Sequence, residues 1–168
     1  MRVGITGHQH LADADAWDWV EARIDEILRG LPRPLVGLTS LAVGADQLFA
    51  RSVLRNRGAL HAVIPFASYE TSFSTHWERQ AYRDLLGAAA DIQVLPKCAT
   101  NEDAYLAAGK RVVDLSDVLI AVWDGLPARG TGGTADVVAY CRKQGTRLIH
   151  LDPVLMCVTY SEPVDWKK

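Results

Sequence analysis

Three glycine-bearing segments each follow an apolar run that predicts a strand. The most prominent is GTGGTADVVAY, residues 130–140, which places three glycines and two threonines in five positions before a predicted helix. The others are TGHQH, residues 6–10, and TSLAVGAD, residues 39–46. Glycine allows close backbone approach, so that N–H groups at a helix start can point at an anion. The pattern predicts a phosphate-bearing ligand, and the alternative for each segment is a tight turn without a ligand.

The candidate ligand- and phosphate-binding residues lie in these segments and at the end of the strand before the third. They are Gly7, His8, Ser40, Gly44, Ala45, Asp46, Trp123, Arg129, Gly130, Thr131, Gly132, Gly133 and Thr134. Arg129 is a candidate for neutralising phosphate charge. Trp123 either stacks on a base or fills the core at the strand end.

Three aspartates are candidates for catalysis if the protein is an enzyme. Asp46 either caps a helix or holds a ribose hydroxyl. Asp124 either stabilises a turn or accepts a hydrogen bond from ribose and activates water. Asp136 either complements a helix dipole or takes part in chemistry. The sequence therefore leaves open whether the ligand is turned over.

Two standard nucleotide motifs fit poorly. Gly130, Gly132 and Ala135 formally match G-x-G-x-x-G/A, but DGLPAR separates them from the preceding strand, and too little chain follows for a second mononucleotide half. A P-loop requires Lys where this chain has Thr131. No cofactor is predicted on these grounds.

Composition narrows the class of protein. The chain has 168 residues, the size of one domain, and a formal net charge of −2 with scattered Lys and Arg. Because a footprint on duplex nucleic acid needs a basic stripe, this pattern argues against such a partner. No apolar run reaches the roughly 18 residues of a membrane span, and no signal peptide is evident. We expect a soluble protein.

The cysteines and histidines predict neither a disulfide framework nor a metal site. Three cysteines are an odd number without C-x-x-C spacing, and the five histidines lack zinc-site spacing. A reducing cytoplasm fits this pattern. Any Mg²⁺ would arrive with the phosphates of the ligand.

The elements that position these residues alternate between strands and helices. Apolar runs predict strands at 2–6, 35–38, 60–64, 92–95, 147–151 and within 117–125, the last near the sheet centre. Helical spacing of apolar residues predicts five helices. The first covers 16–29, and the second and third have the apolar faces Leu48, Phe49 and Val53, and Trp77, Ala81, Leu85 and Leu86. The fourth begins after an N-cap at Asn101 and has the face Tyr105, Ala108, Val112 and Leu115, and the fifth has the face Val137, Val138 and Cys141.

This alternation predicts an α/β fold: a single Rossmann-like, doubly wound, mainly parallel sheet with helices on both faces. Ligands of such sheets bind beyond the carboxyl ends of the strands, where the three glycine segments fall. We expect the domain to cover 1–152 and residues 153–168 to form a tail that packs on the domain or on a partner subunit.

The segments RVGITGH, LAVGADQLFA, SDVLIAVWDG and GTGGTADVVAY, in this order, resemble the SLOG superfamily. That superfamily includes the LOG phosphoribohydrolases, the Rossmann-like domain of DprA and nucleotide-sensing domains of antiviral effectors. The resemblance covers roughly residues 2–152. It implies a Rossmann-like fold that binds a nucleotide or a nucleotide-derived ligand at the glycine segments, and a homo-oligomer, dimer or higher.

The LOG-type active site is incomplete in this chain. Those enzymes carry P-G-G-x-G-T-x-x-E, and aligning its G-T with Gly133 and Thr134 puts Val137 where the catalytic Glu is expected. The matching arginine position falls on Ala108. We therefore favour binding or sensing of an ADP-ribose-like or cyclic nucleotide ligand. The alternative is an N-glycoside hydrolase or transferase acting on a nucleoside 5′-monophosphate through Asp46, Asp124 or Asp136.

Overall fold

The computed structural model describes residues 1–127 and 132–161, and within them seven strands form one sheet. The order across the sheet is β4-β3-β2-β1-β5-β6-β7. The strands are β1 (Arg2–Gly7), β2 (Val36–Thr39), β3 (Ala59–Ile64), β4 (Asp91–Val94), β5 (Val118–Val122), β6 (Arg147–Asp152) and β7 (Cys157–Tyr160). All neighbours pair in parallel except β6 and β7. The predicted fold class is confirmed.

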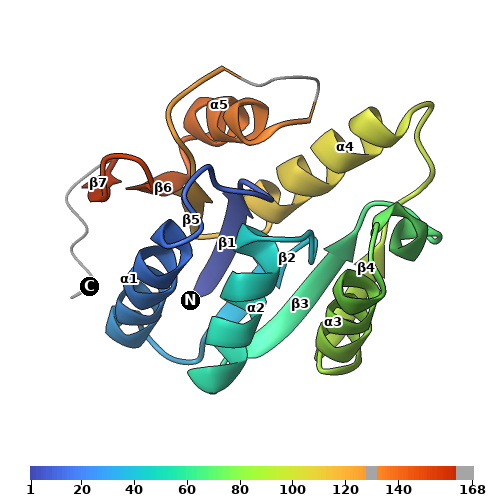
Figure 1. Cartoon of the computed structure of the whole chain (residues 1–168), viewed down its shortest axis with the longest axis horizontal. Helices are drawn as coiled ribbons and strands as arrows, with labels where there is room; N and C mark the ends of the chain where they lie inside the picture. Colours follow the sequence, from blue (N-terminus) through green and yellow to red (C-terminus); the bar gives the residue numbers. More distant parts are fainter. Residues whose placement is uncertain (128–131, 162–168) are drawn as a thin grey trace.

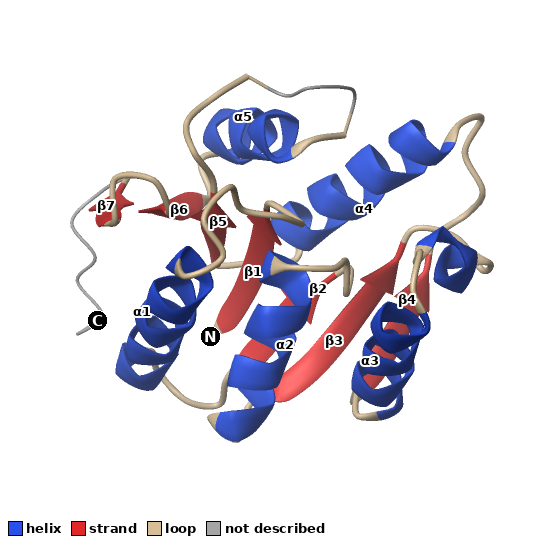
Figure 2. Ribbon diagram, in the orientation of Figure 1, coloured by secondary structure: helices blue, strands red, loops and turns tan. Residues whose placement is uncertain are grey.

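Helices cover both faces of this sheet (Figures 1 and 2). One face packs against α1 (Ala16–Gly30), α2 (Ala45–Arg55) and α3 (His76–Gly87), and the other against α4 (Asn101–Asp114) and α5 (Thr134–Gln144). A short 3₁₀ helix, η1 (Tyr69–Ser72), lies between β3 and α3. The strand order reverses between β1 and β5, which is the switch point where open α/β sheets bind ligands.

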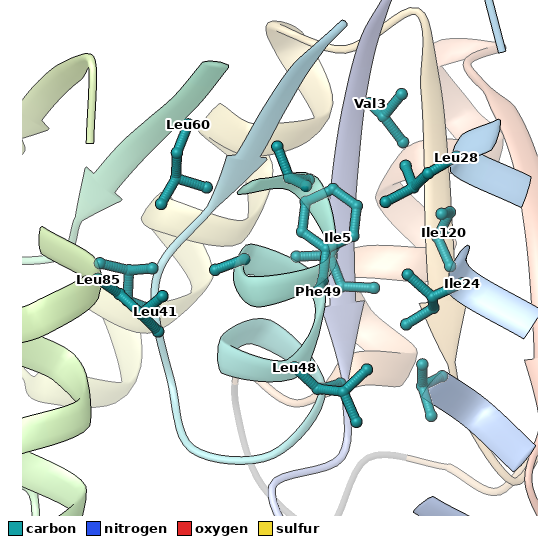
Figure 3. Close-up of a cluster of buried hydrophobic side chains, with 14 of the residues drawn as sticks. Val3, Ile5, Ile24, Leu28, Leu41, Leu48, Phe49, Leu60, Leu85 and Ile120 are labelled. Atoms are coloured by element: carbon teal, nitrogen blue, oxygen red, sulfur yellow. The ribbon is translucent and has the colours of Figure 1, made fainter. Parts of the chain in front are cut away.

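The buried core explains why β1 and β5 lie near the middle of the sheet. Every side chain of β5 is buried, as expected for a strand covered on both faces. In β1, Val3 and Ile5 point toward the α1–α2 face and pack with Leu28, Phe49 and Ile120 (Figure 3). Gly4 pairs with Leu38 on one side and Leu119 on the other, which fixes the register of the central strands.

Two helix starts differ from the sequence prediction. Thr100, and not Asn101, caps α4, because its side chain accepts the Asp103 N–H at 3.1 Å. Trp77 was predicted to face the core, but its side chain is 81% exposed because it lies in the first turn of α3, whose buried residues are Tyr82 and Leu85.

The chain after β6 turns back to form β7. The Asp152 carboxylate accepts the N–H groups of Val154 and Leu155, both at 2.9 Å, which stabilises the turn. β7 then pairs antiparallel with β6, and its other edge is unpaired among the described strands. None of the described helices combines the length and apolar character needed to cross a membrane.

Candidate functional site

A cavity of about 1030 Å³ runs along the carboxyl edge of the sheet. The residues that directly follow five adjacent strands all line it: Pro65 after β3, Ser40 after β2, His8 after β1, Trp123 after β5 and Pro153 after β6. The cavity therefore lies across the point where the strand order reverses, where the fold is expected to bind a ligand.

The start of α5 opens onto this cavity. Gly133 is the N-cap residue and makes no side-chain cap, and the stretch from Gly132 to Ala135 lines the cavity. The first N–H groups of a helix have no intrahelical partner and carry the positive end of the helix dipole. The exposed helix start is therefore suited to an anionic group.

Asp136, a candidate catalytic residue in the first turn of α5, lies outside the cavity lining. Its carboxylate accepts the Gly132 N–H at 2.9 Å, and it is not among the described residues that line the cavity. Gly132 has a φ of +86°, a conformation that favours glycine. The Asp136 side chain thus stabilises the turn that leads into α5.

Asp46 lies at the floor of the cavity and is almost fully buried. Its Oδ2 accepts hydrogen bonds from the Thr39 hydroxyl at 2.9 Å and from the Ser40 N–H at 3.0 Å. Burial raises the pKa of Asp46 to about 6, although these hydrogen bonds and the Ala42 N–H oppose the rise. Asp46 does not cap α2, because Gly44 is the N-cap residue.

Asp124 pairs with His8 at the cavity wall. His8 Nε2 lies 3.1 Å from Asp124 Oδ1 and 3.2 Å from the Asp124 backbone nitrogen, and a proton on Nε2 is donated to the carboxylate. Burial acts to raise the pKa of Asp124, but the Leu126 N–H and His8 together lower it below its ordinary value. This pair joins the ends of β1 and β5, and it presents an ionised carboxylate to the cavity.

Gly44 and Ala45, two predicted binding residues, shape the site without lining it. A side chain at Gly44 would place its Cβ 2.4 Å from the Gln9 carbonyl oxygen. The Ala45 N–H donates to the His8 carbonyl oxygen at 3.1 Å. Both residues hold the segment after β1 against the start of α2.

Trp123 lines the cavity and also anchors the segment that follows it. Its indole N–H donates to the Leu126 carbonyl oxygen at 2.8 Å. One side of the ring meets His150, with centroids 5.4 Å apart, and the Arg142 guanidinium lies 6.0 Å from the ring centroid. Gly7 and Thr134 also line the cavity. Arg129, Gly130 and Thr131 lie outside the described residues.

Several lining residues were missed by the sequence analysis. Tyr69 lies on η1 and Tyr105 on α4, neither of which follows a strand directly. His10 and Asp13 come from the segment between β1 and α1, whose histidine-containing sequence was the available signal. Among the described lining residues the charged side chains are Asp13, Asp46 and Asp124, together with two histidines and no Lys or Arg. The described residues contain no cluster that could hold a metal ion.

No protein-family profile matches the sequence, and no curated protein does. Solved structures do share the fold. DNA processing protein A (DprA) from Streptococcus pneumoniae superposes with a TM-score of 0.65 at 17% identity, over 89% of this chain and 49% of that one. DprA from Helicobacter pylori superposes with a TM-score of 0.65 at 16% identity, over 89% of this chain and 64% of that one. The Moco carrier protein of Chlamydomonas rheinhardtii superposes with a TM-score of 0.53 at 16% identity, over 90% of this chain and 75% of that one.

These structures correct the prediction about nucleic acid. The Helicobacter pylori structure describes a single-stranded DNA binding mode, so the absence of a basic stripe is no ground for excluding nucleic acid from this fold. A single strand is bound by stacking of its bases on aromatic side chains as well as by a positively charged groove, so the basic stripe expected for a duplex is not a complete test for nucleic acid. The exclusion was wrong because it considered only the duplex.

The chain spans about half the length of the first of these proteins and less than two thirds of the second. The likeness covers 89–90% of this chain, and it confirms the predicted resemblance at the level of the fold. The protein has a Rossmann-like fold similar to that of DprA.

Proposed function

We propose that the cavity binds a nucleotide or a nucleotide-derived ligand, such as an ADP-ribose-like molecule or a cyclic nucleotide. The observation that carries this proposal is the start of α5, which opens without a side-chain cap onto a cavity of about 1030 Å³ at the switch point of the sheet. Helix starts in this position bind phosphate through their free N–H groups.

The rest of the lining suits the sugar and base. Asp124 and Asp46 provide carboxylate oxygens that can accept hydrogen bonds from ribose hydroxyls. Tyr105 and Trp123 provide aromatic surface on which a base can pack. A phosphate bound at the α5 start would therefore share one cavity with carboxylates that fit the ribose and with aromatic rings that fit the base.

A second candidate is hydrolysis or transfer at the N-glycosidic bond of a nucleoside 5′-monophosphate. The observation that favours it is the Asp124–His8 pair, which presents an ionised carboxylate to the cavity. Of the three candidate aspartates, Asp136 is engaged by the Gly132 N–H and Asp46 by Thr39 and Ser40. We assign the role of activating water to Asp124 in this alternative.

A proton NMR time course separates the two candidates. The protein is mixed with AMP, CMP, GMP, NAD⁺, ADP-ribose and cyclic nucleotides, and with a single-stranded oligonucleotide in a parallel sample. Broadened lines of one nucleotide without free base support binding or sensing. Free base supports the hydrolase. Broadening of the oligonucleotide alone contradicts both and directs the function to single-stranded nucleic acid.

Variants then test the role of Asp124. If base is released, Asp124→Asn should abolish release while Asp13→Asn, which changes another cavity-lining carboxylate without a histidine partner, should retain it. Equal rates in both variants would remove Asp124 from the chemistry.

The three cysteines are free, which supports a reducing, cytoplasmic setting as part of the proposal.

A further inference from the structure

The cavity is longer than one nucleotide-binding half requires. It extends from Pro65, after β3, to Pro153, after β6, and three other strands lie between them in the sheet (Figure 1). Four strand spacings correspond to about 19 Å. The volume of about 1030 Å³ is at the upper limit of small-molecule sites, which span roughly 300–1,000 Å³.

The end of the cavity near β3 is aromatic. Tyr69 and Tyr105 both line it, with ring centroids 6.0 Å apart and planes at 60°. Tyr69 is buried, and the Tyr105 hydroxyl is held by Ser72 Oγ at 3.2 Å. Pro65 completes this end. A planar base can pack against the Tyr105 ring here.

The opposite end, beside the turn between β6 and β7, carries apolar side chains that are exposed. Val154 is 71% exposed, Met156 45% and Leu126 55%, and all three line the cavity together with Pro127. Contiguous exposed apolar side chains can mark a ligand-binding groove. This second apolar compartment suits a second planar group.

The middle of the cavity is polar, and its described side chains are acidic rather than basic. Asp46, in the first turn of α2, and Asp124, after β5, line the cavity, and the α5 start provides N–H groups without an intrahelical partner. This arrangement fits a short phosphate bridge at the helix start with ribose hydroxyls donating to the carboxylates. An extended single strand adds one phosphate per nucleotide and is normally held by a basic groove.

We infer that the cavity binds a dinucleotide, two nucleosides bridged by one or two phosphates, with one base at Tyr105 and the other between Leu126 and Val154. This inference rests on the proposed function and specifies its ligand. Each base occupies one apolar end, and the bridge crosses the switch point beside α5.

Isothermal titration calorimetry with three probes tests the inference: diadenosine diphosphate, AMP and a single-stranded oligothymidylate. We expect diadenosine diphosphate to bind at least about 100-fold more tightly than AMP, because stacking of the second base adds to the binding free energy. AMP binding as tightly as diadenosine diphosphate would overturn the inference and leave the proposed function standing. Failure of diadenosine diphosphate to bind would overturn the inference, whereas the proposed function would be overturned only if every nucleotide of the NMR mixture also failed to bind. Tighter binding of the oligonucleotide would overturn the inference and assign the cavity to a nucleic-acid strand.

Matched variants locate the two bases. Val154→Asp should weaken diadenosine diphosphate about tenfold and leave AMP unchanged, whereas Leu155→Asp should change neither. The two side chains are both 71% exposed, but only Val154 lines the cavity. Tyr105→Ala should weaken both nucleotides, while Tyr105→Phe, which keeps the ring, should not. Equal effects of the two acidic substitutions would overturn the placement of the second base.

Discussion

The starts of α2 and α5 are nearly the same in sequence and differ in their surroundings. Each has glycine at the N-cap, Gly44 or Gly133, and an aspartate in the first turn, Asp46 or Asp136, and neither has a side-chain cap. The α2 start is closed by the backbone of His8 and Gln9. The α5 start lines the cavity. A glycine at a helix N-cap therefore indicates that another group can lie close to the backbone there. The sequence alone does not tell whether that group is another segment of the chain, as at α2, or a ligand, as we propose for α5.

The two aspartates show the same contrast. Asp46 reaches back to the end of β2 and lies buried on the cavity floor, where it accepts from Thr39 and Ser40. Asp136 reaches only as far as Gly132, four residues before it. The first joins two elements of the sheet edge, whereas the second stabilises a local turn.

The largest expected effect is at the closed start. Gly44→Ala should lower the free energy of unfolding by about 4 kcal/mol, because Gly44 has a φ of +83° and a Cβ there would lie 2.4 Å from the Gln9 carbonyl oxygen. Urea denaturation measures this loss. Gly87→Ala is the control, since a Cβ at Gly87 meets nothing within 4 Å. Equal stability of the two variants would show that the α2 start is not closed by the segment after β1.

Much of the fold could be predicted from the sequence, whereas the surroundings of the two helix starts could not. The six predicted strands lie within about two residues of β1 to β6, because apolar runs ended by glycine or proline reflect burial on both faces. β7 was not predicted as a strand, because it lies at the sheet edge within the segment predicted to form a tail, and its residues are mostly exposed. β5 is the clearest case, since all five of its residues are buried and lie within the predicted run 117–125. Trp77 was misplaced because the helical spacing did not show that it precedes the buried face of α3.

Prediction was less complete for the candidate site. Gly7, His8, Ser40 and Trp123 line the cavity, since the rule that ligands bind beyond strand ends selects residues by their position in the chain. Tyr105 and Val154 reach the same cavity from a helix and from a turn after the last parallel strand, and no local pattern indicates this. Whether these residues bind a ligand stays a prediction.

The next effect concerns the buried carboxyl of the α2 start. The pKa of Asp46 is about 6 in the folded protein against an ordinary 3.8, so the folded state binds more protons than the unfolded state in this range. The free energy of unfolding should therefore fall by about 3 kcal/mol in total, most of it between about pH 4 and pH 7, and then stay level. Asp46→Asn should remove this dependence, because an amide does not ionise and its oxygen can still accept from Thr39 and Ser40.

Urea denaturation of both proteins at pH 4, 5, 6 and 7 measures the difference. The variant should be about equal to the parent at pH 4 and more stable at pH 7. Taking the difference between the two proteins removes the contributions of other carboxyls. Glu78 and Asp124, whose pKa values are lowered, lose their stabilising effect only toward the acid end of this range. Parallel curves from pH 4 to 7 would contradict a raised pKa at Asp46.

The smallest effect is at the open start, and it should appear in binding rather than in folding. Gly133 has φ −72° and ψ 170°, which valine adopts readily, whereas Gly132 has a positive φ and a Cβ there would lie 2.7 Å from the Glu102 carbonyl oxygen. Gly133→Val therefore isolates the approach of a ligand to the helix start. We expect nucleotide affinity to fall about 30-fold, or about 2 kcal/mol, with a change of about 1 kcal/mol or less in the free energy of unfolding. Calorimetry of the nucleotide identified by NMR, with Gly87→Val as the control, measures the affinity. Unchanged affinity in Gly133→Val would mean that α5 begins, like α2, with a glycine that serves the chain alone.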